Sequence, residues 1–369
     1  MEERTIELGY VCDVDYGKRI VQKPGVEAIY PVYGGGGSSF STDSYNREDC
    51  LVIARFSMPK QCAKFIRGKF FLNDNGLTMR SRTDEMRQDY LEWQLLALND
   101  KIYHLGKGSV QRNLDISSLM ELRIRIPSIK KQSCIVEELN LIQSIIERKR
   151  MLINELDNLS SSTFNEMFGD MRNHRLSDFT KLYYLCDVMG RFNGYARENY
   201  VESPEEGVIS LSPANIIDNE LNFDNCTYIS WEQFEHSPMV KVDVGDVILV
   251  RKGANIERWA MVKTLPHDAT VNQHLILLKN IRSIDPLYLT LYLKSPYARK
   301  KYRELAAGAS NPTLSHAKLK SLPVYIPPVK QQYLLAERIE AIEKTKHLIR
   351  KSLVETEALL NGRMSRYFR

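Results

Sequence analysis

Two stretches of the chain place apolar residues at alternating intervals of four and three. The first covers residues 135–160 and the second covers residues 335–360. A period of 3.5 residues keeps one apolar stripe along a helix and is typical of coiled coils. We therefore expect a long helix over each of residues 128–170 and 328–369, with roughly 38 residues of each spanning about 55 Å at 1.5 Å per residue.

The two stripes are expected to pack against each other, because an isolated helix would expose its stripe to water. The alternative is that each helix packs only onto its own globular domain. Lys149 and Lys346 interrupt the stripes and are candidates for setting the register of the pair. The residues predicted to pair the helices are Ile135, Leu139, Ile142, Ile146, Ile153, Leu156, Ile339, Ile342, Ile349, Leu353 and Leu360.

The rest of the chain has a mixed pattern. Short apolar runs such as "CLVIARF" (50–56), "GVISL" (207–211), "DVILV" (246–250) and "HLILL" (274–278) predict strands, with turn signals between them. Helical segments are expected near the end of each region. We therefore predict two α+β domains over residues 1–127 and 171–327, each followed by a long helix, with Gly169 as the stop of the first helix.

An internal repeat marks the start of both helices. Residues 108–139 align without gaps to residues 308–339 with nine identities, and "LRIRIPSIKKQ" (122–132) matches "LPVYIPPVKQQ" (322–332). The tripeptide Cys-Asp-Val also recurs, at 12–14 and at 186–188, where the spacing is 174 residues instead of 200. Fixed ends around a middle of different length indicate a common scaffold that carries divergent loops, and they make the repeated segment a joint between domain and helix.

Composition and charge are compatible with several classes of soluble protein. The chain has 369 residues, 43% hydrophobic and 26% charged, with a net charge of +5 and a pI of about 8.7. This balance is typical of soluble proteins and compatible with a nucleic-acid partner. No apolar run is long enough for a transmembrane helix, and the acidic start is not a signal peptide, so we expect a cytoplasmic protein. The six cysteines lack metal-ligand spacing and are expected to be buried, reduced thiols.

Candidate binding residues follow the predicted strands. "YPVYGGGG" (30–37) permits close backbone approach to a ligand, or forms a flexible loop, and both interpretations remain open. Basic and amide side chains lie near strand ends, and such side chains reach phosphates and base edges; for any single one, a solvated basic loop is the simpler interpretation. The candidate DNA-contacting residues are Tyr33, Gly35, Gly36, Arg55, Lys60, Lys64, Asn73, Arg191, Asn193, Arg251, Lys252, Asn272, Gln273 and His274.

Catalytic motifs are missing from the sequence. No G-x-x-x-x-G-K-[ST] loop occurs, no Pro-Asp dipeptide occurs, and the Asn/Asp/Ser-Pro-Pro-aromatic motif of amino-methyltransferases is absent. The histidines are scattered, and no Ser/His/Asp arrangement stands out. These observations favour a binding protein without catalytic or metal-binding residues of its own.

Taken together, "YPVYGGGG", "GDVILVRKGANI" with "VNQHL", the two G-x-x-x-x-x-L segments leading into L-x-I-x-I-P or its variant, and the paired helices resemble the specificity subunit of type I restriction-modification enzymes. The resemblance covers nearly the whole chain. It implies two target-recognition domains that each read one half of a split double-stranded DNA sequence, and two helices that pair antiparallel. It also implies docking of two methyltransferase subunits and of restriction/translocase subunits. S-adenosylmethionine, ATP and Mg would then be held by those partners.

This chain departs from the expected pattern in two respects, since its charge is modest for a DNA-binding protein and its first domain is short. The two halves differ in sequence, so the DNA target is predicted to be asymmetric. Two other functions remain open at this point. One is a self-sufficient fused restriction-methylation enzyme, and the other is a coiled-coil assembly scaffold that does not read DNA.

Overall fold

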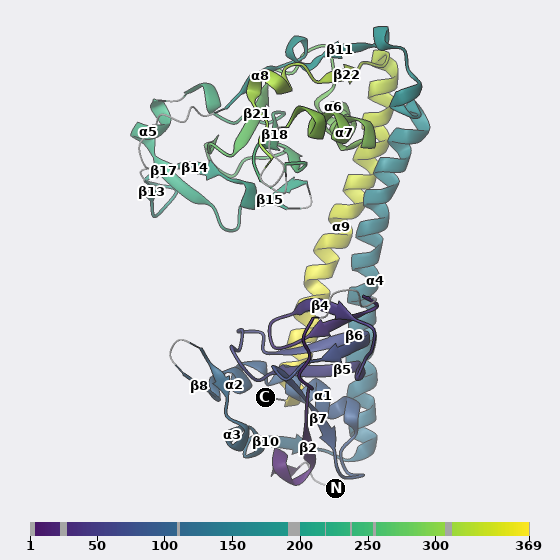
Figure 1. Ribbon diagram of the computed structural model, residues 1–369, viewed down its shortest axis with the longest axis vertical. Coiled ribbons are helices and arrows are strands. Elements are labelled where there is room, and N and C mark those ends of the chain that lie inside the picture. The colour runs from purple at the N-terminus through teal and green to yellow at the C-terminus, as the bar shows by residue number, and fades with distance from the viewer. Residues whose placement is uncertain are drawn as a thin grey trace. The chain divides into compact units, whose positions relative to one another are not determined.

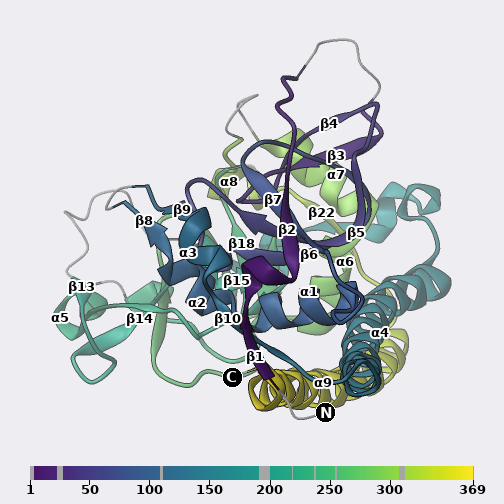
Figure 2. The same cartoon turned by 90° about the horizontal axis from the view of Figure 1, so that it is seen from below.

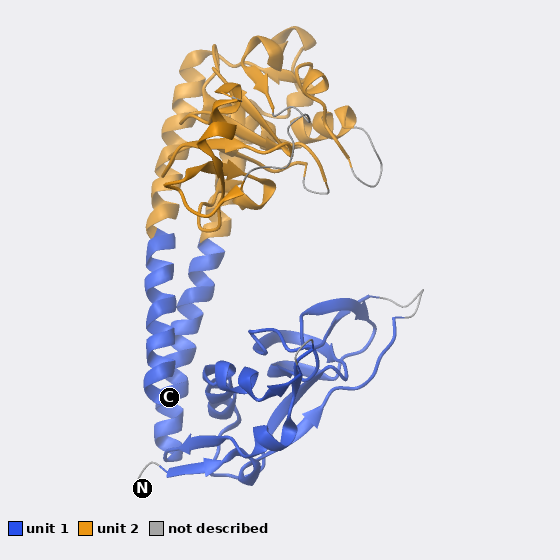
Figure 3. Cartoon of the chain, turned by 90° about the vertical axis from the view of Figure 1, so that its left-hand side faces the viewer, with its two compact units in different colours: residues 1–152, 349–369 blue, residues 153–348 orange. Residues whose placement is uncertain are grey.

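The computed structural model describes residues 4–22, 28–108, 111–190, 200–217, 219–236, 238–253, 256–306 and 312–368. It divides into two compact units (Figure 3). Unit 1 consists of residues 1–152 and 349–369, and unit 2 consists of residues 153–348. Each unit therefore contains parts of both long helices.

The long helices are α4 (Ile129–Phe168) and α9 (Val329–Phe368), of 40 residues each. At 1.5 Å per residue, each is about 60 Å long. Gly169 follows α4 with a φ of +67°, a conformation that favours glycine over other residues, so the predicted helix stop is found there.

Unit 1 contains a six-stranded sheet with the order β2-β7-β5-β6-β3-β4 (Figure 1). β3 and β6 run parallel, whereas the other neighbours are antiparallel. Two further pairs are β1 with β10 and β8 with β9. The strands are β1 (Arg4–Glu7), β2 (Cys12–Tyr16), β3 (Tyr30–Tyr33), β4 (Ser38–Thr42), β5 (Arg47–Ala54), β6 (Ala63–Leu72), β7 (Gly76–Ser81), β8 (Gly106–Lys107), β9 (Asn113–Leu114) and β10 (Arg123–Ile126). The short helices are α1 (Gln88–Ala97), α2 (Asn99–His104), α3 (Ile116–Met120) and the 3₁₀ turn Leu8–Tyr10.

Unit 2 has two four-stranded sheets, with the orders β12-β21-β18-β19 and β13-β17-β14-β20, and two smaller pairs, β11 with β22 and β15 with β16. The strands are β11 (Phe179–Lys181), β12 (Asp187–Met189), β13 (Tyr200–Val201), β14 (Gly207–Leu211), β15 (Ile216–Ile217), β16 (Glu220–Leu221), β17 (Thr227–Ser230), β18 (Val247–Val250), β19 (Trp259–Met261), β20 (Ala269–Val271), β21 (Leu275–Lys279) and β22 (Pro323–Tyr325). The helices are α5 (Trp231–Glu235), α6 (Pro286–Lys294), α7 (Pro296–Leu305), α8 (His316–Leu319) and the 3₁₀ turns Met171–Asn173, Leu176–Asp178, Leu182–Tyr184, Pro213–Asn215 and Pro238–Val240.

Within each unit, the parts of α4 and α9 lie side by side, and Figure 2 views them nearly end-on. In unit 1, Glu138 contacts Arg363 and Tyr367, while Lys149 donates hydrogen bonds to Ser352 and Thr356. Partner numbers on α9 fall as those on α4 rise, so the helices are antiparallel. The predicted α+β fold with paired helices is confirmed.

The same helices also pack onto the domains. Ile135, Leu139, Ile142 and Ile146 share one buried core with residues of the six-stranded sheet and with Leu360. In unit 2, Ile339 is buried and Ile342 lies against the core. Ile153, Leu156, Ile349 and Leu353 are half-buried. The apolar stripe therefore has two neighbours, the other helix and the adjacent domain.

The aromatic residues at the two helix ends make matching contacts. Phe368, at the end of α9, packs against Tyr90 of α1 in unit 1, with ring centroids 5.3 Å apart. Phe168, at the end of α4, packs against Tyr288 of α6 in unit 2 at 5.2 Å. Each domain thus receives the C-terminal end of one long helix.

Two sequence expectations bear on other properties of the chain. Cys12, Cys62 and Cys186 are buried and Cys50 and Cys226 are half-buried, but Cys134 is exposed. The expectation of a buried thiol is therefore wrong at Cys134, because this position of α4 faces away from the stripe that contains Ile135. Within the described residues, no helix combines the length and the apolar character needed to cross a membrane.

Candidate nucleic-acid interface

The repeated joint has the same hydrogen bonds in both units. Gln132 is fully buried, donates to the carbonyl of Pro127 at 2.9 Å and accepts from the backbone N–H of Arg87 at 2.9 Å. Gln332 donates to Pro327 at 2.9 Å and accepts from the N–H of Asp285 at 2.8 Å. Each glutamine thereby ties the start of a long helix to the start of α1 or α6.

The Cys-Asp-Val echo also marks equivalent positions. The backbone N–H of Arg82 bonds Val11, and its side chain pairs with Asp13. Arg282 repeats this arrangement, with a backbone bond to Leu185 and an ion pair with Asp187. The asparagine and arginine partners of Asp187 lower the pKa of its carboxyl. These pairs fix the strand that leads into each candidate site.

In unit 1, several chain segments converge on Asn73, and we call this region the Asn73 corner. It consists of residues 16–18, 33–37, 55–56 and 73–75. Asn73 donates its backbone N–H to Tyr33 at 2.9 Å, and its side-chain oxygen accepts from the N–H of Asn75 at 2.9 Å. The N–H of Arg55 then bonds the carbonyl of Asn75 at 2.8 Å.

Unit 2 contains the same arrangement around Asn272, and we call residues 211–215, 251–252 and 272–274 the Asn272 corner. Asn272 donates its N–H to Leu211 at 2.8 Å, and its side-chain oxygen accepts from the N–H of His274 at 2.9 Å. The N–H of Arg251 bonds the carbonyl of His274 at 2.8 Å. Arg55 and Arg251 thus occupy equivalent positions, as do Asn73 and Asn272.

The repeat joins each corner to its helix. The N–H of Leu114 bonds the carbonyl of Arg55 at 2.8 Å, and the N–H of Leu314 bonds that of Arg251 at 3.0 Å. Both leucines are buried members of the 200-residue repeat. The corners also differ in chemistry, because a glycine loop follows Tyr33 where Ser212 to Asn215 follow Leu211.

The glycines near Asn73 have different structural roles. A Cβ at Gly17 would lie 1.9 Å from the carbonyl oxygen of Asn73, and one at Gly35 would lie 2.8 Å from the Cβ of Ala54. A Cβ at Gly36 would meet nothing within 4 Å. Packing therefore requires glycine at 17 and 35, whereas Gly36 is exposed and free to approach a ligand. Gly34 to Gly37, with Asn73 and Asn75, line a shallow hollow.

Aromatic rings surround the arginine of the Asn73 corner. The guanidinium carbon of Arg55 lies 4.9 Å from the ring centroid of Tyr16 and 4.6 Å from that of Phe56. Both rings are exposed, at 43% and 38%. In the Asn272 corner, by contrast, the Nε of Arg251 donates to the carbonyl of Leu314 at 3.2 Å.

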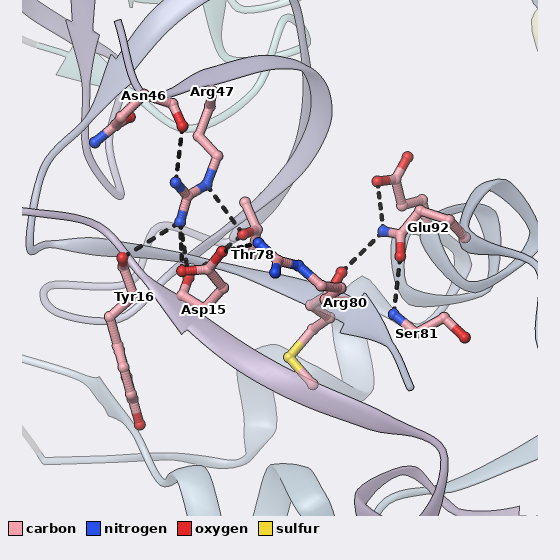
Figure 4. A network of polar contacts seen from close by, with 10 residues as sticks. Asp15, Tyr16, Asn46, Arg47, Thr78, Arg80, Ser81 and Glu92 are labelled. Atoms are coloured by element: carbon pink, nitrogen blue, oxygen red, sulfur yellow. Dashed lines mark hydrogen bonds and ion pairs between the residues drawn. The ribbon is translucent and has the colours of Figure 1, made fainter. Parts of the chain in front are cut away.

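A half-buried polar network supports Tyr16 (Figure 4). Arg47 forms an ion pair with Asp15 at 2.8 Å, and its guanidinium donates to Thr78 at 3.2 Å and to the carbonyl of Tyr16 at 3.3 Å. The Tyr16 ring points away from this network. Nearby, burial raises the pKa of Glu92, which accepts a hydrogen bond from Gln88. This network therefore holds the strand on which Tyr16 meets Arg55.

The Asn272 corner borders a histidine. A Cβ at Gly190 would lie 1.8 Å from the Nε2 of His316, so a larger residue at 190 would displace the ring. Burial, together with Arg251 and Lys320, holds the pKa of His316 below its ordinary value. Its Nε2 has no hydrogen-bond partner among the described residues.

The remaining predicted contact residues are dispersed. Lys252 is exposed beside Thr313, and Gln273 is exposed between Asn272 and His274. Lys60 lies in the connection from β5 to β6, and Lys64 lies on β6 opposite Val52. Arg191 and Asn193 lie outside the described residues. The predicted residues that the structure brings together are therefore Tyr33, Gly35, Gly36, Arg55 and Asn73 in one corner, and Arg251, Lys252, Asn272, Gln273 and His274 in the other.

Sequence reasoning missed four residues of these regions: Tyr16, Phe56, Asn75 and His316. The Asn-x-Asn and Asn-x-His spacings carry a usable signal, because asparagine often bonds the backbone N–H two residues ahead. Tyr16 and His316 had no such signal, since their neighbours are distant in the sequence.

Comparison with known proteins shows which proteins this chain resembles. Residues 214–358 match the model of the type I restriction modification DNA specificity domain. The chain is 22% identical over 282 residues to the EcoKI specificity subunit of Escherichia coli K12, covering 71% of this chain. It is 20% identical over 313 residues to the MjaVIII specificity subunit of Methanocaldococcus jannaschii, covering 79% of this chain and 72% of that protein.

The chain is therefore similar to the type I restriction-modification specificity subunits, and its residues 214–358 match their DNA specificity domain. It spans 60% of the length of the E. coli relative. Among solved structures of this family, the S subunit from M. genitalium superposes with a TM-score of 0.56 and 16% identity, over 100% of this chain and 96% of that one.

A second solved chain has the same fold. It comes from a study of complex assembly and conformational transition of the type I R-M system, with a TM-score of 0.55, 14% identity and coverage of 100% and 97%. Similarity at this level shows a shared fold.

Proposed function

We propose that this chain is the sequence-specific DNA-recognition subunit of a type I restriction-modification system, and that each unit binds one half of a bipartite, asymmetric DNA target. The observation that carries this proposal is the likeness between the Asn73 corner and the Asn272 corner. They have the same backbone hydrogen bonds, joined to the same helix pair by the same repeat, but they expose different side chains. One scaffold with two unlike surfaces is suited to reading two unlike half-sites.

The chemistry of the corners supports DNA as the ligand. Arginine, asparagine and histidine side chains cluster there, and these groups hydrogen-bond base edges and phosphates. Lys18 in the Asn73 corner and Arg19 beside it are exposed, and the N–H of Lys18 bonds the carbonyl of Leu72. Phosphate contacts by such residues would supply affinity, and base contacts would supply sequence preference.

The partners follow from the family. Two methyltransferase subunits would dock on this chain, and restriction/translocase subunits would join them in the cytoplasm. The recognition subunit would have no catalytic site, and S-adenosylmethionine, ATP and Mg would bind to the partners. The exposed faces of α4 and α9, which carry Leu141, Leu152 and Leu348, are suitable for such docking.

Selection from random DNA tests this proposal. The full chain would be co-expressed with its methyltransferase subunit, purified, and mixed with a pool of random-sequence duplexes at moderate salt. We expect the bound pool to be enriched in two unlike half-sites at a fixed spacing. A complex that forms without sequence enrichment would favour an assembly scaffold, and methyl transfer by the chain alone would favour a fused enzyme; either result contradicts the proposal.

A further inference from the structure

We infer that Arg55, held by Tyr16 and Phe56, reads a guanine in the half-site bound by unit 1, and that its counterpart Arg251 does not have this role. The inference rests on the proposed function. Arg55 would then determine sequence specificity in the Asn73 corner, whereas Arg251 would not do so in the Asn272 corner.

The backbone of Arg55 is hydrogen-bonded within the protein, whereas its guanidinium has no such bond in the part of the chain that the structure describes. Its N–H and carbonyl bond Asn75 and Leu114, which places it at the end of β5. Among the described residues, no carboxylate pairs with its guanidinium and no acceptor takes a hydrogen bond from it. Five N–H donors on a half-buried side chain therefore remain available for an external acceptor.

The two rings restrain the guanidinium without using these donors. A cation within about 6 Å of a ring centroid is attracted to the ring, and stacking on an aromatic ring suits the planar arginine fork in particular. A fork that is already restrained loses less conformational entropy on binding. Such a group matches the two acceptors, O6 and N7, that guanine presents in the major groove.

A phosphate is the less suitable ligand for this arrangement. Phosphate contacts require charge more than a fixed orientation, and the exposed Lys18 and Arg19 can supply that charge next to the same corner. The network around Arg47 gives Tyr16 a fixed backbone position, because Arg47 bonds the carbonyls of both Asp15 and Tyr16. The Arg47 network thus helps to hold the orientation of the Arg55 guanidinium, as reading a base requires.

Arg251 differs in its side-chain contacts. Its Nε donates to the carbonyl of Leu314, so part of its fork is occupied within the protein. This bond ties the end of β18 to the repeat. We therefore assign Arg251 a structural role in the corner.

The test uses the full chain in complex with its methyltransferase subunit and the random-duplex selection described above. Arg55→Ala should lose preference for one guanine in one half-site by about 10-fold to 100-fold, with the other half-site unchanged. Arg55→Lys should lose the same preference, because lysine keeps the charge but not the fork. Arg67→Ala is the matched control, because it removes the same charge from the same sheet. Arg67 is exposed, and its guanidinium lies over the ring of Phe65.

The outcomes separate the inference from the proposed function. If the wild-type complex shows no sequence preference, the proposed function fails. If the wild type is selective and Arg55→Lys keeps the full preference, or if Arg55→Ala weakens binding equally for all sequences, Arg55 contacts phosphate and the inference is overturned. Far-ultraviolet circular dichroism of each variant controls for folding, which should be retained because the bonds that place Arg55 come from its backbone.

Discussion

At each joint between domain and helix, one buried glutamine bonds two backbone groups: a proline carbonyl before the long helix and an N–H before α1 or α6. Replacing Gln132 or Gln332 with leucine would leave the N–H of Arg87 or Asp285 and a proline carbonyl without these partners. Buried backbone groups without partners are costly. We expect each substitution to lower the free energy of unfolding by about 2–3 kcal/mol.

Gln331 provides the control for this prediction. It precedes Gln332 but is exposed, so Gln331→Leu should change stability by less than about 0.5 kcal/mol. Urea denaturation followed by circular dichroism measures all three variants. Equal effects of Gln331→Leu and Gln332→Leu would show that the hydrogen bonds of Gln332 are not what stabilises the joint.

A pH dependence is expected at His316. Burial and the nearby Arg251 and Lys320 hold its pKa below 6.5, so the folded state binds this proton less readily than the unfolded state. The stability of the fold is then independent of this histidine at a pH above its pKa in the unfolded chain, and it decreases as pH falls below about 6.5. Thermal melts between pH 7.5 and 5.5 should show a smaller acid-induced drop for His316→Gln than for the wild type.

His347 is a suitable comparison for that experiment, because it is exposed on α9. His347→Gln should keep the acid-induced drop of the wild type. An unchanged drop in His316→Gln would mean that the proton uptake occurs elsewhere in the chain.

Single residues were predictable where a local pattern carried the information. The repeat identified Gln132 and Gln332, and residue type at a strand end identified Arg55, Arg251, Asn73 and Asn272. Tyr16 was not identified, because its contact with Arg55 depends on how β2 and β5 lie in the folded sheet. The exposure of Cys134 was missed because free cysteines are usually buried, whereas its helix face decides the matter here.

At the scale of elements, the two lysines in the helix stripes make specific contacts across the pair. Lys149 donates to the side chains of Ser352 and Thr356, both at 2.7 Å. Lys346 is only 3% exposed and donates to Asp157 at 2.6 Å, with Glu220 and Glu343 each within 3.5 Å. Both lysines that interrupt the stripes therefore form hydrogen bonds to the other helix, as a role in setting the register of the helix pair requires.

Removing one partner from a buried charge network is expected to be costly. Lys346→Ala would leave Asp157 without its cation, while Lys263 still pairs with Glu220 and Glu343, and we expect a loss of about 1–2 kcal/mol in unfolding free energy. Lys344, on the exposed side of the same helix, is the control, and Lys344→Ala should stay within about 0.5 kcal/mol of the wild type. If the two variants are equally stable in urea denaturation, the Lys346 network does not hold the helices.

Strands and helices differed in how far the sequence predicted them. The periodic pattern predicted α4 and α9, and the apolar runs predicted β5, β14, β18 and β21. Strand order was not predictable, because β3 pairs in parallel with β6, and β14 with β20, although other strands lie between them in the chain. Such pairings depend on contacts between residues distant in the chain, which local patterns do not contain.

At the scale of the whole molecule, the C-terminal end of each long helix completes one of the two units. Residues 349–369 belong to unit 1, although they are the last in the sequence. The contact of Phe368 with Tyr90 closes this unit, and the contact of Phe168 with Tyr288 does the same in unit 2. Prediction of the boundaries at residues 127, 171 and 328 used element types alone and could not assign the helix ends to domains.

Hydrogen–deuterium exchange can test these end contacts. Phe368→Ala removes a buried ring and should cost about 3–4 kcal/mol, with faster exchange in α1 and α2. Phe168→Ala should have the same effect in α6 and α7. Arg366→Ala is the control, since Arg366 is exposed and its substitution should leave exchange in α1 unchanged. Faster exchange confined to the end of α9 in Phe368→Ala would contradict this role.

The central claim is that each unit reads its own half of the DNA target. The most direct measurement exchanges residues 8–127 for the corresponding domain of a relative and reads the methylated sequence in the host by single-molecule sequencing. One half of the methylated target should change while the other half stays the same. A change in both halves, or in neither, would contradict it.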